Sequence, residues 1–289
     1  MKIVTDSGAD LSISVEEREA LGIHVVPLVV TLEGQTYREG VDIQPEDFYR
    51  LLESTEALPI TSQPAAGDFA ETYRRLAQED PEILSIHISS GLSGTYQSAL
   101  AGAEMAPEAR VTVVDAKTLS AAAGWQVHAA ARAAKAGWPL ERILELIQRL
   151  NRATESIYTL SELKYLIHGG RISHMKGLIA SVLRLKPLIG VEKEGGTYVQ
   201  RGQVRTFQGA LRGLVDLMAE YHPPGSALRV QVLHAMNPAG AEQLKALIEE
   251  RFECDWLPMA PMSLVLGAHT GPSMVGVAFA PAEAFAEVP

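Results

Sequence analysis

Hydroxyl groups are concentrated in one short segment of the chain. Residues 89–95 read Ser-Ser-Gly-Leu-Ser-Gly-Thr and follow the apolar run at residues 83–88. Hydroxyls donate hydrogen bonds, glycine lets a ligand approach the backbone closely, and a helix N-terminus favours an anion. The segment is therefore suited to hold a carboxylate or a phosphate. The same residue types are also common in ordinary caps and turns, and the lysine of a P-loop is missing.

Three further short strings contain polar side chains that could belong to the same anion site. Thr61-Ser62-Gln63-Pro64 is a second hydroxyl cluster, which by itself reads as a helix cap before the proline. Gly169-Gly170-Arg171 ends a helix-like stretch at residues 160–168, where Arg171 is either a solvated side chain or part of a site. His269 is followed closely by glycine and proline and is expected in a loop. It is either a structural histidine or part of a functional site.

The familiar catalytic and metal-binding motifs are missing from the sequence. The string Gly91-Leu92-Ser93-Gly94-Thr95 has its second glycine one place too early for a nucleophile elbow, and GxGxxG, HExxH and EF-hand patterns do not occur. The single cysteine, Cys254, excludes an internal disulfide and a thiolate zinc cluster. The remaining histidines are scattered, which argues against a metal site. The residues therefore indicate an anion-accepting site without recognisable catalytic machinery.

The composition limits the classes of protein to consider. The chain has 289 residues, with 25 Lys and Arg against 35 Asp and Glu, a formal net charge of -10, and 47% hydrophobic residues. That apolar fraction excludes global disorder and suffices for buried cores. The acidic balance argues against a nucleic-acid partner, because binding to phosphates needs clustered Lys and Arg. The length suggests about two domains.

Membrane insertion is not expected. Residues 256–282 carry no charged side chain, which is a stretch long enough to span a bilayer. The run contains four prolines and three glycines, however, and these would leave backbone groups unpaired in lipid. Buried strands and tight turns fit it better. With no signal peptide at the N-terminus, the sequence predicts a cytoplasmic protein.

The elements of the first half alternate in a way that is typical of an α/β fold. Short apolar runs alternate with helical patterns, and this alternation predicts βαβ units. We expect a Rossmann-like, mainly parallel sheet with helices on both faces, and polar loops at the carboxyl ends of its strands, where such sheets bind ligands. The expected strands are residues 2–5, 24–32, 83–88 and 111–114, and the expected helices are residues 15–21, 45–53, 96–105 and 116–135.

The second half has a different pattern. Residues 188–201 read as an antiparallel hairpin that turns at Gly195-Gly196. Strands are expected at residues 228–233 and 274–279, with a helix at residues 239–252 between them. The sequence therefore predicts an N-terminal α/β domain, residues 1–155, which carries the hydroxyl loops, and a C-terminal α+β domain, residues 156–289.

Taken together, these strings resemble the DegV family of bacterial fatty-acid-binding proteins. Each string is weak alone, but they occur in the family's order over nearly the whole chain. The matching strings are Thr5-Asp6-Ser7 with Asp10-Leu11, Thr61-Ser62-Gln63-Pro64, Ile88-Ser89-Ser90-Gly91-Leu92-Ser93-Gly94-Thr95-Tyr96, Val113-Val114-Asp115, Gly169-Gly170-Arg171-Ile172, Leu185-Lys186-Pro187 and His269-Thr270-Gly271-Pro272.

The resemblance implies one long-chain fatty acid, such as palmitate, bound between two domains, with the acyl pocket formed by the C-terminal domain and no cofactor. Residues 177–185 and 258–277 are the segments expected to line the pocket. The resemblance also implies the residues around the carboxylate, which are Thr61, Ser93, Ser62, Gly94, Thr95, Arg171 and His269.

The resemblance further implies a partner protein. Some members of the family are the binding subunit of fatty acid kinase and present the carboxylate to a separate ATP-binding subunit. Such a chain is a carrier in lipid transport or fatty acid metabolism and not itself an enzyme. Arg205 is expected to face the partner or the phosphate. The sequence departs from the family here, because Phe207-Gln208-Gly209 follows where Lys and Arg are common.

Two other functions compete with this interpretation. The chain could be an enzyme that acts on a phosphorylated or acyl substrate, with His269 as general acid and base. It could instead be a scaffold that binds a partner protein and carries no lipid.

Overall fold

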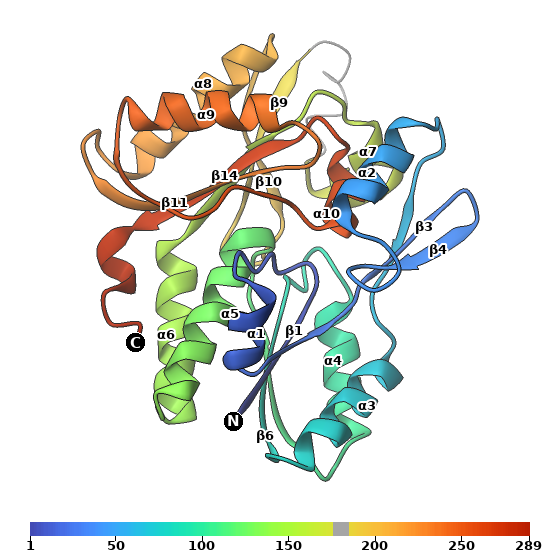
Figure 1. Ribbon diagram of the computed structural model, residues 1–289. Coiled ribbons are helices and arrows are strands. Elements are labelled where there is room, and N and C mark those ends of the chain that lie inside the picture. The colour runs from blue at the N-terminus through green and yellow to red at the C-terminus, as the bar shows by residue number, and fades with distance from the viewer. Residues whose placement is uncertain (176–184) are drawn as a thin grey trace.

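The computed structural model describes residues 1–175 and 185–289, and its N-terminal half is built on a parallel sheet (Figure 1). The strands are β1 (Lys2–Asp6), β2 (Ile23–Val26), β6 (Glu82–His87) and β7 (Arg110–Asp115), in the order β2-β1-β6-β7. All three pairings are parallel. Successive residues of β1 point to opposite faces, so Ile3 and Val4 enter different apolar clusters. The predicted parallel sheet is confirmed.

Helices cover both faces of this sheet, as predicted (Figure 1). On one face lie α3 (Ala66–Ala77) and α4 (Thr95–Glu104), which pack through Phe69, Tyr73 and Ala99. On the other lies α5 (Ser120–Lys135), followed by α6 (Leu140–Ala153). The short helix α1 (Val15–Ala20) begins at Ser14, whose side chain accepts a hydrogen bond from the backbone N–H of Glu17.

The second half forms a larger, mostly antiparallel sheet. Its strands are β8 (Glu155–Thr159), β9 (Lys186–Val191), β10 (Tyr198–Val204), β11 (Ala227–His234), β12 (Glu253–Trp256), β13 (Ala260–Pro261) and β14 (Val275–Pro281). Their order is β10-β9-β8-β14-β11-β12, with β13 beside β11. Helices α8 (Phe207–Tyr221) and α9 (Pro238–Glu249) pack on the sheet, and η3 (Ala282–Phe285) follows its last strand. The predicted α+β half and its hairpin are confirmed. The boundary between residues 155 and 156 stays a prediction.

Helix α5 lies between the two sheets (Figure 1). Its Val127 belongs to the core of the first sheet, while Ala121 and Trp125 pack against Leu233 and Ala278 of the second. Most of its residues are buried, and many are alanine. Small side chains suit this place, because a helix packed on both sides needs backbones to approach closely on two faces.

A third, small sheet was not expected. Its order is β4-β3-β5, from β4 (Gln35–Arg38), β3 (Val29–Leu32) and β5 (Ile60–Ser62), and α2 (Pro45–Glu53) lies in the connection between β4 and β5. The prediction of one strand over residues 24–32 was wrong. The chain leaves the first sheet after β2 because Pro27 cannot donate to a ladder and the Leu28 N–H bonds to Ser7 Oγ (2.9 Å).

The uncharged stretch at residues 256–282 folds into β13, the helix α10 (Leu264–Thr270) and β14. Strands and turns were expected there, so α10 is a correction; all its residues are buried, which removes the periodicity that identifies a helix from sequence. Helix α7 (Lys164–His168) is shorter than the predicted stretch at residues 160–168, and η1 (Arg171–Met175) follows it. Among the residues that the structure describes, no helix is long and apolar enough to cross a membrane.

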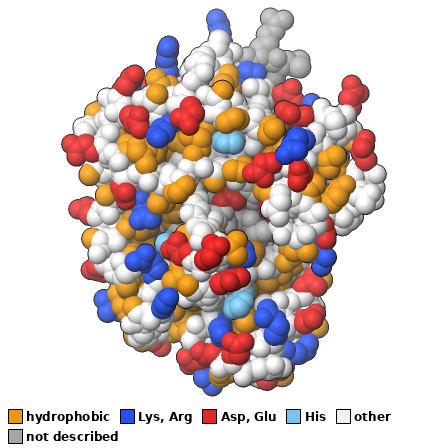
Figure 2. Space-filling view, in the orientation of Figure 1, with side chains coloured by type: hydrophobic (Ala, Val, Ile, Leu, Met, Phe, Trp, Pro, Cys, Tyr) orange, Lys and Arg blue, Asp and Glu red, His pale blue; other side chains and the backbone are white. Residues whose placement is uncertain are grey.

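The visible surface is mixed in charge. On the face shown in Figure 2, acidic and basic side chains are interspersed with apolar ones. This distribution fits the small excess of acidic over basic residues and leaves no broad field of one sign on that face.

Candidate functional site

Five of the predicted carboxylate-binding residues line one small cavity. Thr61, Ser62, Ser93, Arg171 and His269 surround a volume of about 30 Å³. They come from β5, the loop before α4, η1 and the end of α10, so four distant segments of the chain meet at one point. Which of them bind a ligand stays a prediction, but the structure brings these five together.

Thr61 and His269 are in direct contact. The Thr61 Oγ1 and His269 Nε2 atoms lie 2.8 Å apart. Thr61 stands in β5, paired with Val30 of β3, so its interpretation as a helix cap was wrong; α3 begins only at Ala66. His269 lies in the last turn of α10 and not in the expected loop.

His269 is held as a neutral imidazole. Burial lowers the pKa of His269 to about 3, and the electrostatic influence of the nearby Arg171 and His168 acts in the same direction. Its Nδ1 atom is buried and has no hydrogen-bond partner within residues 1–175 and 185–289. A neutral ring can donate or accept at Nε2, beside Thr61, according to its tautomer.

The position of His269 depends on the absence of a side chain at residue 169. A Cβ atom built on Gly169 would overlap the Nδ1 atom of His269. We therefore expect Gly169→Ala to displace the ring, to break its contact with Thr61 and to destabilise the fold by about 1–3 kcal/mol. The NMR signals of the His269 ring and the melting temperature would both report this. Gly67→Ala in α3 is the matched control, because nothing lies within 4 Å of the Cβ it adds; equal effects of the two changes would contradict the expectation.

The loop before α4 orients Ser93. The Ser93 Oγ atom lies 2.8 Å from Thr95 Oγ1 and also accepts from the Thr95 N–H at 3.3 Å. Gly94 is the N-cap residue of α4, and Thr95 is fully buried at its start. Neither Gly94 nor Thr95 lines the cavity. The structure thus brings Ser93 to the cavity and places Thr95 behind it.

Arg171 joins two walls of the site. Its Nε donates to the carbonyl oxygen of Leu92 at 3.1 Å, and its Nη1 donates to that of Gly169 at 2.7 Å. Among the described residues, its guanidinium bonds to these two carbonyl oxygens and forms no ion pair. An arginine has five N–H donors and a fixed positive charge, which suit it to bind an anion.

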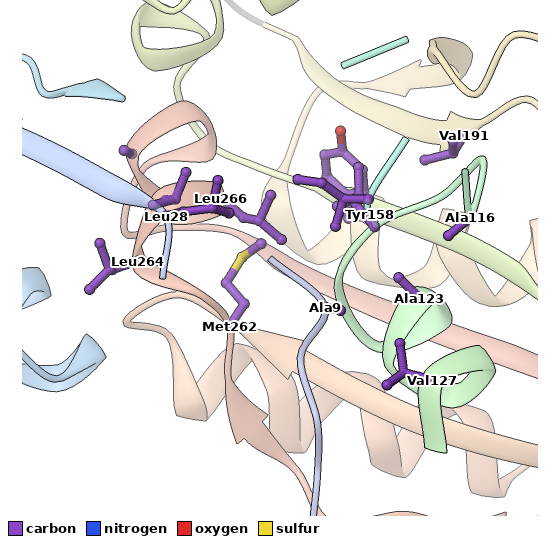
Figure 3. Packing of buried hydrophobic residues seen from close by; sticks show 14 of the residues in the cluster. Ala9, Leu28, Ala116, Ala123, Val127, Tyr158, Val191, Met262, Leu264 and Leu266 are labelled. Carbon is purple, nitrogen blue, oxygen red and sulfur yellow. The ribbon is translucent and has the colours of Figure 1, made fainter. Parts of the chain in front are cut away.

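Apolar side chains complete the cavity and lead to a second one. The second cavity, of about 20 Å³, is lined mainly by apolar side chains, among them Ile157, Tyr158, Met262, Met274 and Val277. In Figure 3, Leu28, Leu266 and Met262 lie together, and Tyr158 lies further along the same core, toward Val191 and Ala116. The further apolar lining of the first cavity consists of Leu28, Ile88, Leu92, Leu119, Tyr198, Val265 and Leu266.

Of the two segments that were expected to line an acyl pocket, the structure shows one at the cavities and leaves most of the other undescribed. Met262, Val265, Leu266 and Met274, all within residues 258–277, line the two cavities. Of the expected lining at residues 177–185, residues 177–184 lie outside the described residues.

Arg205 is remote from the site. It is exposed and directly follows the last residue of β10. Tyr198 is the first residue of that strand, so at the rise of an extended strand the two residues lie about 20 Å apart. Among the polar residues after the predicted strands, Asp6, Ser7 and Asp115 do not line the cavity either. Asp115 Oδ1 accepts from the N–H groups of Ser90 (3.2 Å) and Lys117 (2.9 Å), so it fixes loops.

A buried serine–histidine–aspartate arrangement was missed from the sequence. The Ser85 Oγ atom lies 2.7 Å from His87 Nε2, and His87 Nδ1 lies 2.9 Å from Asp6 Oδ2. Tyr73 Oη continues the network at 2.8 Å from Ser85 Oγ. Asp6, Ser85 and His87 have no solvent exposure at all, so no substrate reaches Ser85. The network links β1, β6 and α3.

The comparisons with known proteins agree with this architecture. The model of the DegV family, described as an uncharacterised protein family, matches residues 1–282. A DegV domain-containing protein of Staphylococcus aureus is 36% identical over 275 residues, which is 95% of this chain and 96% of that protein.

Two solved structures share the fold over nearly all of both chains. The DegV family protein from Thermus thermophilus, described by its fatty acid binding, is 31% identical, with a TM-score of 0.84 over 97% of this chain and 99% of that one. DegV from Bacillus subtilis, described as a fatty acid binding protein, is 29% identical, with a TM-score of 0.85 over 96% and 98% of the two chains. The sheet order, the converging polar loops and these matches lead to one conclusion: this chain belongs to the DegV family.

Proposed function

We propose that this protein binds a long-chain fatty acid, with the carboxylate at Thr61, Ser93 and Arg171 and the acyl chain directed toward the second cavity. The observation that carries the proposal is the convergence of these three groups and His269 on a cavity whose other walls are apolar. The fatty acid binding of the family proteins from Thermus thermophilus and Bacillus subtilis supports it.

The polar end of the site matches the needs of a carboxylate. A buried carboxylate without partners is costly, so several donors must converge on it. Arg171, which bonds to two carbonyl oxygens and to no acidic side chain of the described residues, supplies a positive charge, and charge-assisted hydrogen bonds of this kind are the stronger ones. The neutral His269 adds a hydrogen-bonding nitrogen, Nε2, beside Thr61 without a second buried charge.

The apolar end needs side chains to move. Cavities of about 30 and 20 Å³ have room for little more than one water molecule each. An acyl chain therefore has to displace side chains, and the flexible Met262 and Met274 are suited to this. Burial of the chain contributes about 0.8 kcal/mol for each methylene, which offsets the cost of rearrangement.

The proposal includes the role of a carrier. The protein would hold palmitate or a similar acid in the cytoplasm and present its carboxylate to the ATP-binding subunit of a fatty acid kinase, without acting as an enzyme itself. Domains 1–155 and 156–289 would enclose the acid between them. Arg205 is exposed and would contact the partner, since it lies too far from the cavity to touch the carboxylate.

Native mass spectrometry tests the binding proposal directly. We expect purified protein to carry, or to take up when offered, one molecule with the mass of a C16–C18 fatty acid. Protein that stays free of ligand in the presence of palmitate and oleate would refute the proposal. Acyl-phosphate formation by an added kinase subunit, dependent on this chain, would test the carrier role separately.

The carboxylate contacts can be tested by substitution. We expect Thr61→Ala and Ser93→Ala to weaken binding of palmitate by about 5- to 30-fold each, because each removes a hydrogen bond to a charged group. The double variant should bind more weakly than either single variant. Thr72→Ala on α3, whose hydroxyl donates to the carbonyl oxygen of Asp68, is the control. An unchanged affinity of the double variant, measured by isothermal titration calorimetry, would reject these contacts.

A further inference from the structure

Two side chains stand between the cavities of the site. Leu119 and Tyr198 each line both cavities, and each is only 4% exposed. Leu119 comes from the loop between β7 and α5, and Tyr198 is the first residue of β10. They approach from different sheets of the molecule, so any continuous apolar passage between the cavities has to pass them.

The backbone on both sides of Leu119 is strained. Lys117 and Ser120 both have a φ of 54°, in the left-handed region that non-glycine residues rarely adopt. Such conformations persist only where their surroundings fix them, and they gather at ligand sites. Here the Thr118 carbonyl oxygen accepts from Ser89 N–H, and the Ser120 N–H donates to the Gly8 carbonyl oxygen, each at 2.8 Å. The main chain of Leu119 is therefore held, so a change in the width of the passage at this position has to come from its side chain.

The frame around Tyr198 is held as well. The ring of Tyr198 packs edge-on against that of Tyr158, with 5.6 Å between the centroids. The turn before β10 lies directly on the loop of Leu119, since a Cβ atom on Gly196 would lie 3.1 Å from Lys117 Cα. Gly196 itself has a φ of 67°. The two loops are thus packed together, which keeps Leu119 and Tyr198 facing the same gap.

We infer that Leu119 and Tyr198 form a gate that sets the length of acyl chain the protein selects. The inference rests on the proposed function. With the carboxylate fixed at Thr61 and Ser93, a short acid ends in the first cavity, enlarged by the displacement of side chains, and only a longer one passes Leu119 and Tyr198. The substrate class is then the straight-chain acids long enough to pass the gate and bury their ends among Met262, Met274 and Val277.

A series of saturated acids from C8 to C18 tests the gate. Below the length that reaches Leu119, we expect affinity to rise by about fourfold for each added methylene, the equivalent of about 0.8 kcal/mol. Leu119→Ala should widen the passage and raise the ratio of C16 to C10 affinity at least tenfold. Leu119→Phe should narrow it and lower the same ratio at least tenfold.

Leu146→Ala in α6 is the matched control, because Leu146 is also buried (2% exposed) but lines neither cavity. Its C16 to C10 ratio should equal that of the unmodified protein even though its stability falls. The inference is overturned if both Leu119 variants leave the ratio unchanged, or if Leu146→Ala moves it equally. Failure of the unmodified protein to bind any acid in the series would instead refute the proposed function.

Discussion

Replacing Glu39 with glutamine should make the protein more stable above neutral pH and leave it nearly unchanged in mild acid. Glu39 is 8% exposed and packs against the start of α10. Its carboxyl accepts from Ser7 Oγ (2.7 Å), Ser263 Oγ (2.8 Å) and the Leu264 N–H (2.7 Å). Burial raises the pKa of Glu39 to about 8, more than these hydrogen bonds lower it.

The direction of the pH effect follows from these values. In the unfolded chain Glu39 loses its proton near its ordinary pKa of 4.5, whereas the folded protein keeps the proton up to about pH 8. The unfolded state therefore binds fewer protons in this interval, and stability falls as the pH rises through it. Glutamine carries no such proton, so the variant should gain about 3–5 kcal/mol relative to the unmodified protein between pH 4.5 and 8.

Urea unfolding at pH 5 and pH 8.5 would measure this gain. Burial also raises the pKa of the nearby Asp10 to about 7, and the Asp10 charge contributes to the raised pKa of Glu39. Glu71→Gln, at an exposed position of α3, should change stability little at either pH. Parallel pH profiles of the Glu39 variant and the unmodified protein would contradict the expectation.

The second large effect is expected at His87. His87→Ala removes the ring that lies 2.9 Å from the Asp6 carboxyl and leaves it with the N–H groups of Gly8 and Ile88, at a place where both side chains have no exposure. Removal of one member of a buried pair typically costs about 3–5 kcal/mol, because the other charge stays uncompensated. That is a large part of the about 5–15 kcal/mol by which domains are stable, so we expect the melting temperature to fall by 10 °C or more, at about 2–4 °C per kcal/mol.

A second substitution separates the charge effect from the loss of packing. Asp6→Asn combined with His87→Ala should recover part of the lost stability, since no buried charge is left. His128→Ala is the control, because its contact with Glu17 (3.1 Å) lies at the surface and contributes about 1 kcal/mol or less. If the single and double His87 variants are equally unstable, the buried charge is not the cause.

The sequence predicted the elements that local pattern decides. Short apolar runs gave β1, β6 and β7, and Pro45 marked the start of α2. The pattern failed where distant contacts decide. The chain breaks between β2 and β3 because of a bond from Leu28 to Ser7, and β5 exists only through its pairing with β3. Neither contact leaves a periodic signal.

The residues of the candidate site also fall into those that the sequence predicted and those that only distant contacts reveal. The polar residues followed from their types and from the family resemblance, and the cavity contains five of them. Leu119 and Tyr198 could not be found from sequence, because nothing local distinguishes them from ordinary core residues. Ser85 and His87 are two residues apart on one strand, but their aspartate lies 81 residues from the histidine. Only the parallel pairing of β1 with β6 brings the three together.

The place of β14 in the second sheet has a consequence for synthesis on the ribosome. In the described strand order, β14 joins the half that contains β10, β9 and β8 to the half that contains β11 and β12. Residues 275–281 form the last strand in the described part of the chain, so they leave the ribosome after all of the preceding strands. Until then the two halves are not joined, and one wall of the second cavity, which includes Val277, is missing. A nascent chain should therefore be unable to retain a fatty acid until translation is almost finished.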